Sequence, residues 1–313
     1  MAASSTVKSF DGTRIHYRTQ GEGPVMCACN GIGVSTFFWN YLVKYFSKSH
    51  RVIVWDYRFH GKSGPGPDYD GLTMETNARD LLAVLDGAKA DKAVLLGHSM
   101  GVQTILEFYR QHPDRCSALI PVLGAYGRPL DTFLGTDIFK YLFAFGFYPM
   151  FLFPGAVQKA VRTGLKVLFS DYVAWPGARL TGLVNFQHIR KKDLHLYLDH
   201  LKTLDLRAFM AMAKHMQEHS ARAILPEITV PVLVIAGEDD LFTPLEISKD
   251  MHGMIPHSEL LVIPRGSHAA LVEQPELMNL RIEKFLRERV ENPCPPGKKR
   301  KSLRAKGKMK KTG

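Results

Sequence analysis

The sequence predicts an α/β fold, in which a mostly parallel central sheet has helices on both faces and carries an inserted helical cap. Short apolar runs alternate along the chain with amphipathic segments of helical length. These runs lack the polar–apolar alternation of a half-solvated sheet, so both faces of each strand are expected to be buried. One long interval interrupts the alternation, which then resumes with the same pattern.

The first half of the alternation predicts four strands, at residues 25–29, 51–55, 93–96 and 118–123. Two helices are expected among them, at residues 73–87 and 100–111. In the first of these, Met74, Ala78, Leu81 and Leu85 recur at helical spacing, which predicts one buried face. The second half predicts strands at residues 232–236 and 259–263 and helices at 245–254 and 275–290.

The interval at residues 125–224 is rich in aromatic side chains and has a helical pattern. We interpret it as a cap inserted over the strand ends of a core that comprises residues 1–124 and 225–292. Pro293, Pro295 and Pro296 then end the domain, and the basic tail at residues 293–313 is expected to be disordered.

The positive charge is concentrated in the tail. The formal net charge is +11, but residues 298–313 hold nine Lys or Arg and no acid, so the remainder carries about +2. No aromatic residues interleave with these cations, so nucleic-acid binding is at most an accessory property. The remaining expectation is weak contact of the tail with nucleic acid or with anionic lipid. The sequence does not determine the oligomeric state.

The N-terminus lacks a signal-peptide core and no apolar run reaches about 20 residues. These two features favour a cytoplasmic protein with at most peripheral membrane contact.

A nucleophile motif follows the predicted strand at 93–96. Gly97-His98-Ser99-Met100-Gly101 places a serine between two glycines, immediately before a predicted helix. The strand-to-helix turn in such a motif is too tight for side chains two residues before and after the serine. Ser99 is therefore the predicted nucleophile, and the alternative is a tight turn with an idle serine.

Serine needs a base, and the base needs an orienting acid. His268 lies in the loop after the last predicted strand. Taken alone, a histidine there is slightly more often structural than catalytic. Three carboxylates follow the strand at 232–236, namely Glu238, Asp239 and Asp240. We select Asp240 as the orienting acid, and Asp239 is the alternative. The chain order Ser…Asp…His matches the order found in α/β hydrolases.

The oxyanion donors are expected to be backbone N–H groups. Met100 follows the nucleophile, and Ile32 lies in the loop Asn30-Gly31-Ile32-Gly33 after the strand at 25–29, which could also be a plain glycine turn. The predicted substrate pocket includes Asn30, His98, Phe145 and Phe147. The alternative for these aromatic residues is packing of the cap onto the core.

These motifs resemble the α/β-hydrolase superfamily, in its branch of carboxylesterases, lipases and cofactor-free haloperoxidase-like enzymes. The resemblance extends over residues 25–124 and 226–290 and includes the segment Asp56 to Ser63, which it implies is a structural loop beside the site. The family often has His-Gly where this chain has Asn30-Gly31. The resemblance implies no metal or organic cofactor.

The predicted function is hydrolysis of carboxylic esters with an apolar acyl or alcohol group, a small-molecule substrate, through an acyl-enzyme. C–C bond hydrolysis, lactone hydrolysis and cofactor-free haloperoxidase-like activity remain alternatives on the same triad. A ligand-binding receptor without catalysis is the alternative of another class. Haloalkane dehalogenases and epoxide hydrolases are disfavoured because they use Asp at the position of Ser99.

Overall fold

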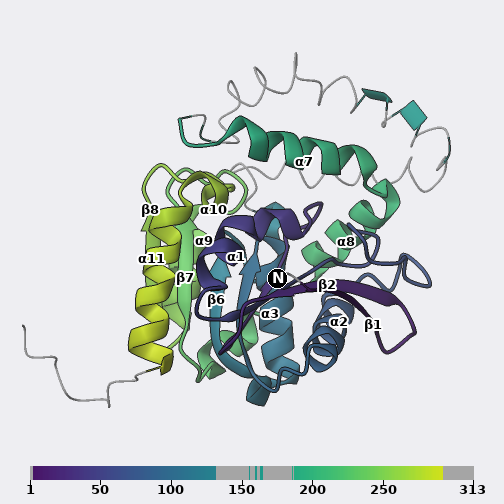
Figure 1. Ribbon diagram of the computed structural model, residues 1–313. Helices are drawn as coiled ribbons and strands as arrows, with labels where there is room; N and C mark the ends of the chain where they lie inside the picture. Colours follow the sequence, from purple (N-terminus) through teal and green to yellow (C-terminus); the bar gives the residue numbers. More distant parts are fainter. Residues whose placement is uncertain are drawn as a thin grey trace, which may run out of the picture.

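The computed structural model describes residues 3–131, 155, 159–160, 163–164, 185 and 187–291. Within these residues one eight-stranded sheet runs through the molecule in the order β1-β2-β4-β3-β5-β6-β7-β8 (Figure 1). The strands are β1 (Ala3–Lys8), β2 (Arg14–Gln20), β3 (Val25–Cys29), β4 (Arg51–Trp55), β5 (Ala93–His98), β6 (Cys116–Val122), β7 (Leu233–Gly237) and β8 (Glu259–Ile263). β1 and β2 pair antiparallel, and all pairs from β4 to β8 are parallel. The predicted fold class is confirmed.

The six parallel strands lie where the apolar runs predict them. β5 continues two residues past its predicted end, to His98, so the sheet leads directly into the nucleophile turn. The pattern of apolar runs did not predict β1 and β2. β1 is an edge strand that is exposed along most of its length, so it carries no apolar run to reveal it.

Helices cover both faces of the sheet. They are α1 (Asn40–Phe46), α2 (Met74–Gly87), α3 (Met100–Gln111), α9 (Leu245–Met254), α10 (Ala270–Glu273) and α11 (Pro275–Phe285). α2, α3 and α9 contribute to one hydrophobic cluster, whereas α1, α10 and α11 contribute to the other. Thr73 is the N-cap of α2, since its hydroxyl accepts a hydrogen bond from the N–H of Thr76 at 3.2 Å. α11 ends at Phe285, and a π-helical turn at Leu286–Glu291 completes the predicted segment.

Between β6 and β7, the described residues contain two longer helices, α7 (Lys191–Thr203) and α8 (Leu206–Glu218), which lie above the sheet (Figure 1). α8 is fixed at its start by Asp205. This carboxylate accepts hydrogen bonds from the N–H groups of Arg207 and Ala208 and from the Tyr69 hydroxyl at 3.2 Å. α8 is therefore tied to the core through the loop before α2.

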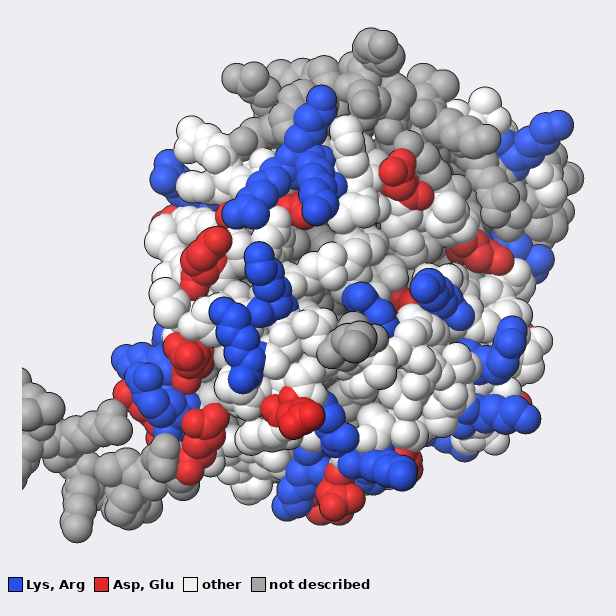
Figure 2. All heavy atoms as spheres, viewed as in Figure 1, with Lys and Arg blue, Asp and Glu red and all other residues white. Residues whose placement is uncertain are grey.

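Surface charge in the described part of the molecule is mixed. Lys and Arg side chains lie among Asp and Glu side chains on the face in Figure 2, as expected for the near-neutral charge outside the tail. Phe145, Phe147 and the basic tail lie outside the described residues. Within the described ranges, no helix combines the length and hydropathy needed to cross a bilayer.

Candidate active site

Ser99 occupies a sharp turn between β5 and α3. Its backbone has φ +54° and ψ −118°. L-residues rarely adopt this conformation, and where they do it is often at a catalytic site. A Cβ on Gly97 would lie 2.2 Å from the carbonyl oxygen of Gly101, and a Cβ on Gly101 would lie 2.4 Å from that of Cys29. Both positions must therefore be glycine for the turn to close. The Ser99 N–H donates to the carbonyl oxygen of Val122 at 3.1 Å, which anchors the turn to β6.

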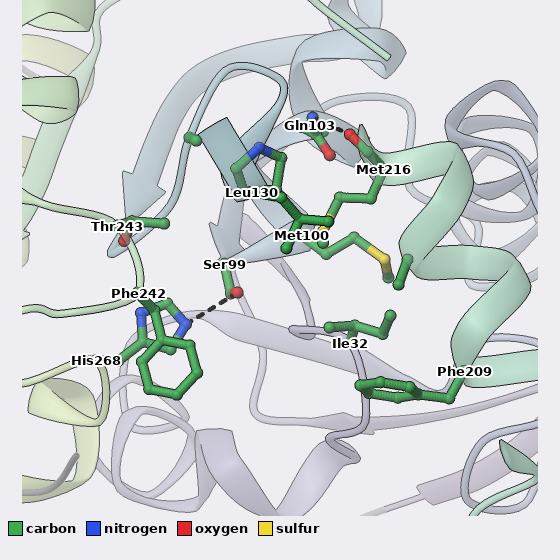
Figure 3. A pocket seen from close by; sticks show the side chains of 13 residues that line it. Ile32, Ser99, Met100, Gln103, Leu130, Phe209, Met216, Phe242, Thr243 and His268 are labelled. Carbon is green, nitrogen blue, oxygen red and sulfur yellow. Dashed lines mark hydrogen bonds between the residues drawn. The ribbon is translucent and has the colours of Figure 1, made fainter. Parts of the chain in front are cut away.

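The structure brings Ser99, His268 and Asp240 together from three separate loops. Nε2 of His268 lies 3.0 Å from Ser99 Oγ, as Figure 3 shows. On the other side of the ring, Nδ1 lies 2.9 Å and 3.1 Å from the two carboxylate oxygens of Asp240. An Nδ1–H facing the carboxylate leaves the Nε2 lone pair facing the serine hydroxyl, which is the tautomer a general base requires.

Asp240 is held as a buried carboxylate. It accepts hydrogen bonds from the N–H of Phe242 at 2.8 Å and from the N–H and hydroxyl of Thr243 at 3.0 and 2.8 Å. Burial alone would raise the pKa of Asp240, but His268 and the Thr243 hydrogen bonds outweigh burial and lower it. The rival Asp239 is exposed, and its N–H donates to the carbonyl oxygen of Gly266. Asp240 is thus the carboxylate that faces His268.

Two aromatic rings pack against the His268 imidazole. The Phe242 ring stacks on it with centroids 4.8 Å apart and an interplanar angle of 25°. The His98 ring lies at 5.0 Å, and its Nε2 donates to the His268 carbonyl oxygen at 3.0 Å. Burial and the neighbouring His268 lower the pKa of His98 to about 3, so His98 is neutral at physiological pH. These contacts restrict both the ring and the backbone of His268.

The loop that contains Ile32 passes directly beside the serine. A Cβ on Gly31 would lie 3.1 Å from the Ser99 Cβ. The next residue after Ile32, Gly33, donates its N–H to Nε2 of His60 at 3.2 Å, while Nδ1 of His60 donates to the Arg58 carbonyl oxygen at 2.8 Å. Met100 begins α3, so its N–H has no acceptor within the helix. The N–H groups of Ile32 and Met100 are therefore in the neighbourhood where an oxyanion would form.

A cavity of about 320 Å³ lies next to the serine. Figure 3 shows Ser99, His268 and Phe242 at one end, with Phe209 and Met216 of α8 at the opposite side. The residues lining it are Ile32, Ser99, Met100, Gln103, Ala125, Pro129, Leu130, Phe209, Ala213, Met216, Phe242, Thr243 and His268. No lining residue in this described cavity is a Lys, Arg, Asp or Glu, so the cavity favours uncharged, apolar groups.

Of the four residues that the sequence predicted for the pocket, the two described ones, Asn30 and His98, do not line the cavity. Asn30 is buried and its amide donates to the Trp55 carbonyl oxygen at 2.6 Å, and His98 is buried behind His268. Sequence reasoning missed Phe209, Met216 and Phe242. The position of Phe242, two residues after Asp240, was the one available signal.

One group of potential metal ligands lies apart from this site in the described residues. Ligand atoms of Glu75, Glu107 and His219 lie within 4.8 Å of one another. However, the Glu107 carboxylate already accepts hydrogen bonds from Arg110 and from Gln111 at 2.6 Å. A guanidinium on the carboxylate opposes a second cation there, so this cluster is better explained as an ion-pair network.

Known proteins are similar to this chain in structure or in sequence. An esterase from Exiguobacterium antarcticum aligns with a TM-score of 0.75 at 20% identity, over 91% of this chain and 100% of the esterase. Bifunctional epoxide hydrolase 2 from Rattus norvegicus is 22% identical over 304 residues, which are 90% of this chain and 55% of that protein. The chain therefore spans about half the length of this relative.

Another relative is matched over nearly its whole length. A 2-hydroxy-6-oxononadienedioate/2-hydroxy-6-oxononatrienedioate hydrolase from Paraburkholderia phymatum is 28% identical over 294 residues, covering 91% of this chain and 96% of the relative. The family model described as alpha/beta hydrolase fold matches residues 24–275, a range that includes Ser99, Asp240 and His268. This match shows that the chain belongs to the α/β-hydrolase fold family, a family of hydrolases, and the sheet order and the nucleophile turn agree with it.

Proposed function

We propose that this hydrolase cleaves carboxylic esters that carry an apolar acyl or alcohol group. The observation that carries the proposal is the position of Ser99. Its hydroxyl is hydrogen-bonded to the Asp240-bound His268 and borders an uncharged cavity of about 320 Å³. That volume lies near the lower end of ordinary ligand pockets, which span roughly 300–1,000 Å³. A small or medium-sized ester fits it.

The reaction proceeds in two halves. Ser99 Oγ attacks the ester carbonyl carbon while His268 Nε2 takes the hydroxyl proton, and the imidazolium that forms is stabilised by Asp240. The N–H groups of Ile32 and Met100 donate to the oxyanion of the tetrahedral intermediate. His268 returns the proton to the leaving alcohol, and the acyl-enzyme remains. Water, deprotonated by the same imidazole, then releases the acid and regenerates Ser99.

The test is a chain-length series of p-nitrophenyl esters on the wild-type protein, on Ser99→Ala and on His268→Ala. We expect the wild type to turn over the esters with an initial burst of p-nitrophenol. Both variants should fold and should lose this turnover. A fluorophosphonate probe should label the wild type and not Ser99→Ala. Labelling without turnover on any ester would favour a ligand-binding receptor instead. Turnover by Ser99→Ala near the wild-type rate would overturn the mechanism.

Two reactions suggested by relatives are disfavoured, one by the lining of the cavity and one by the identity of the nucleophile. The Paraburkholderia phymatum enzyme is named for dioate substrates, which carry two carboxylates. The described lining of this cavity contains no Lys or Arg to pair with them. Epoxide hydrolysis is disfavoured because Ser99 occupies the position at which epoxide hydrolases have Asp. The apolar lining therefore favours an uncharged ester over a dioate.

A further inference from the structure

One polar side chain in the cavity wall has no role in the reaction described above. Gln103 lies one helical turn after Ser99 on α3 and is 1% exposed. The remaining polar groups in the wall are already used, because Ser99, His268 and Thr243 hydrogen-bond within the Asp240 network. Among the described lining residues, Gln103 is thus the polar side chain that lies outside this network.

The orientation of the Gln103 amide follows from its neighbours. Its Nε2 donates to the carbonyl oxygens of Met216 at 2.9 Å and His219 at 3.5 Å, at the end of α8. A flipped amide would point its oxygen at these two carbonyls, where it could accept from neither. The nitrogen therefore faces α8, and Oε1 must point elsewhere.

Oε1 of Gln103 is buried and has no hydrogen-bond partner among the described residues. Figure 3 shows it turned toward the side of the cavity where Met100 and Met216 lie. Leaving a buried amide oxygen unpaired is unfavourable, so such groups in folded proteins usually have a partner. Met100 and Met216 are flexible enough to move aside for one.

We infer that Gln103 is a specificity residue, and that the preferred substrate carries a hydroxyl or N–H group on the chain that fills this cavity. The inference rests on the proposed function of the site. Residues four apart on a helix have Cβ atoms about 5–6 Å from one another, so the donor belongs several atoms from the reacting carbonyl. The expected substrate is an ester whose acid or alcohol part is apolar near the ester bond. The same part carries a hydroxyl or N–H group further along its chain.

Matched pairs of p-nitrophenyl esters test this inference. Each ω-hydroxyalkanoate from 6-hydroxyhexanoate to 8-hydroxyoctanoate is compared with the alkanoate in which methyl replaces the hydroxyl, heptanoate to nonanoate. We expect kcat/KM to favour the hydroxyl ester about tenfold for at least one pair, because the hydroxyl pairs with Oε1. A plain apolar pocket does the opposite and disfavours every hydroxyl ester. That second result would overturn the inference.

Two variants assign the effect to the amide. Gln103→Met keeps a side chain of similar length without the acceptor, and it should reverse the preference toward the methyl ester. Met216→Leu reshapes the same wall but leaves the backbone carbonyl that binds Gln103, so the hydroxyl preference should persist. A preference that survives Gln103→Met would exclude Gln103 as its cause.

Binding measurements separate failure of this inference from failure of the proposed function. Calorimetric titration of Ser99→Ala with ethyl 6-hydroxyhexanoate to ethyl 8-hydroxyoctanoate, each against its methyl analogue, reports the Gln103 contact without any turnover. About tenfold tighter binding of one hydroxyl ester supports the inference even if the wild type hydrolyses neither. Equal or weaker binding of all three overturns it even if the wild type is an active esterase.

Discussion

The Nε2–H of His98 donates a hydrogen bond to the backbone carbonyl oxygen of His268 across 3.0 Å. His98 immediately precedes the nucleophile, so this bond ties the end of β5 to the loop that carries the base. Because burial and His268 lower the pKa of His98 to about 3, the donor stays neutral and places no competing charge beside the imidazolium of the transition state. We regard His98 as a positioning residue.

Replacing His98 should therefore affect the chemical step more than substrate binding. We expect His98→Leu to lower kcat about tenfold with little change in KM, in line with the loss of one buried hydrogen bond. His98→Gln, which can still donate to a carbonyl, should restore part of the rate. Steady-state kinetics on a p-nitrophenyl ester measure both, with a thermal melt to check folding. Unchanged kcat in His98→Leu would rule out this role.

The two neighbouring carboxylates should differ sharply when amidated. Asp240→Asn should lower kcat by about 10⁴, the loss known for a triad acid whose amide stabilises the wrong imidazole tautomer. Asp239→Asn is the matched control, because Asp239 is exposed and the hydrogen bonds to His268 come from Asp240. It should change kcat little. Comparable losses in both variants would mean that the segment's backbone, and not the Asp240 carboxylate, is what matters.

Glu107 should contribute stability that depends on pH. Burial raises its pKa, but hydrogen bonds from His219, Arg110 and Gln111 outweigh burial and lower the pKa to about 2 from 4.5. A lowered folded-state pKa stabilises the protein above pH 4.5, and this contribution is lost as the pH falls toward 2. Glu107→Gln should therefore lower the free energy of unfolding by about 1–3 kcal/mol at pH 7.

Urea denaturation at pH 7, 5 and 4 measures this effect. The difference between wild type and Glu107→Gln should be constant from pH 7 to 5 and should shrink at pH 4. Arg110→Gln provides a comparison, since it removes one cation and leaves the carboxylate. A difference that is independent of pH would show that Glu107 acts through packing alone.

The α8 wall should set the preferred acyl length. Each buried methylene contributes about 0.8 kcal/mol, so kcat/KM should rise several-fold per carbon until the cavity is full. Phe209→Ala removes a large side chain from the wall and should move the optimum to longer chains, with a smaller effect on the acetate ester. A chain-length profile of the p-nitrophenyl esters measures the shift. Preference for acetate in the wild type would contradict an acyl role for this cavity.

The sequence predicted the parallel part of the sheet because its strands are buried on both faces and appear as continuous apolar runs. It did not reveal β1, whose side chains are mostly exposed and whose formation depends on pairing with β2. Ser99, His268 and Asp240 could be selected because each follows a strand in a recognisable position. The contacts of His98 and Phe242 with His268 could not, because they arise from the folding together of distant loops.

The way α8 is attached to the core allows its cavity-lining side chains to vary separately from the catalytic residues. Asp205 holds its beginning through Tyr69, and Gln103 holds its end, so the helix is fixed at both termini. Between these anchors, α8 supplies Phe209, Ala213 and Met216 to the cavity and no member of the Ser99 network. Substitutions at these three positions should therefore change the range of substrates while leaving the Ser99 network intact. A selection library restricted to them should yield a high fraction of active clones, each with its own substrate range.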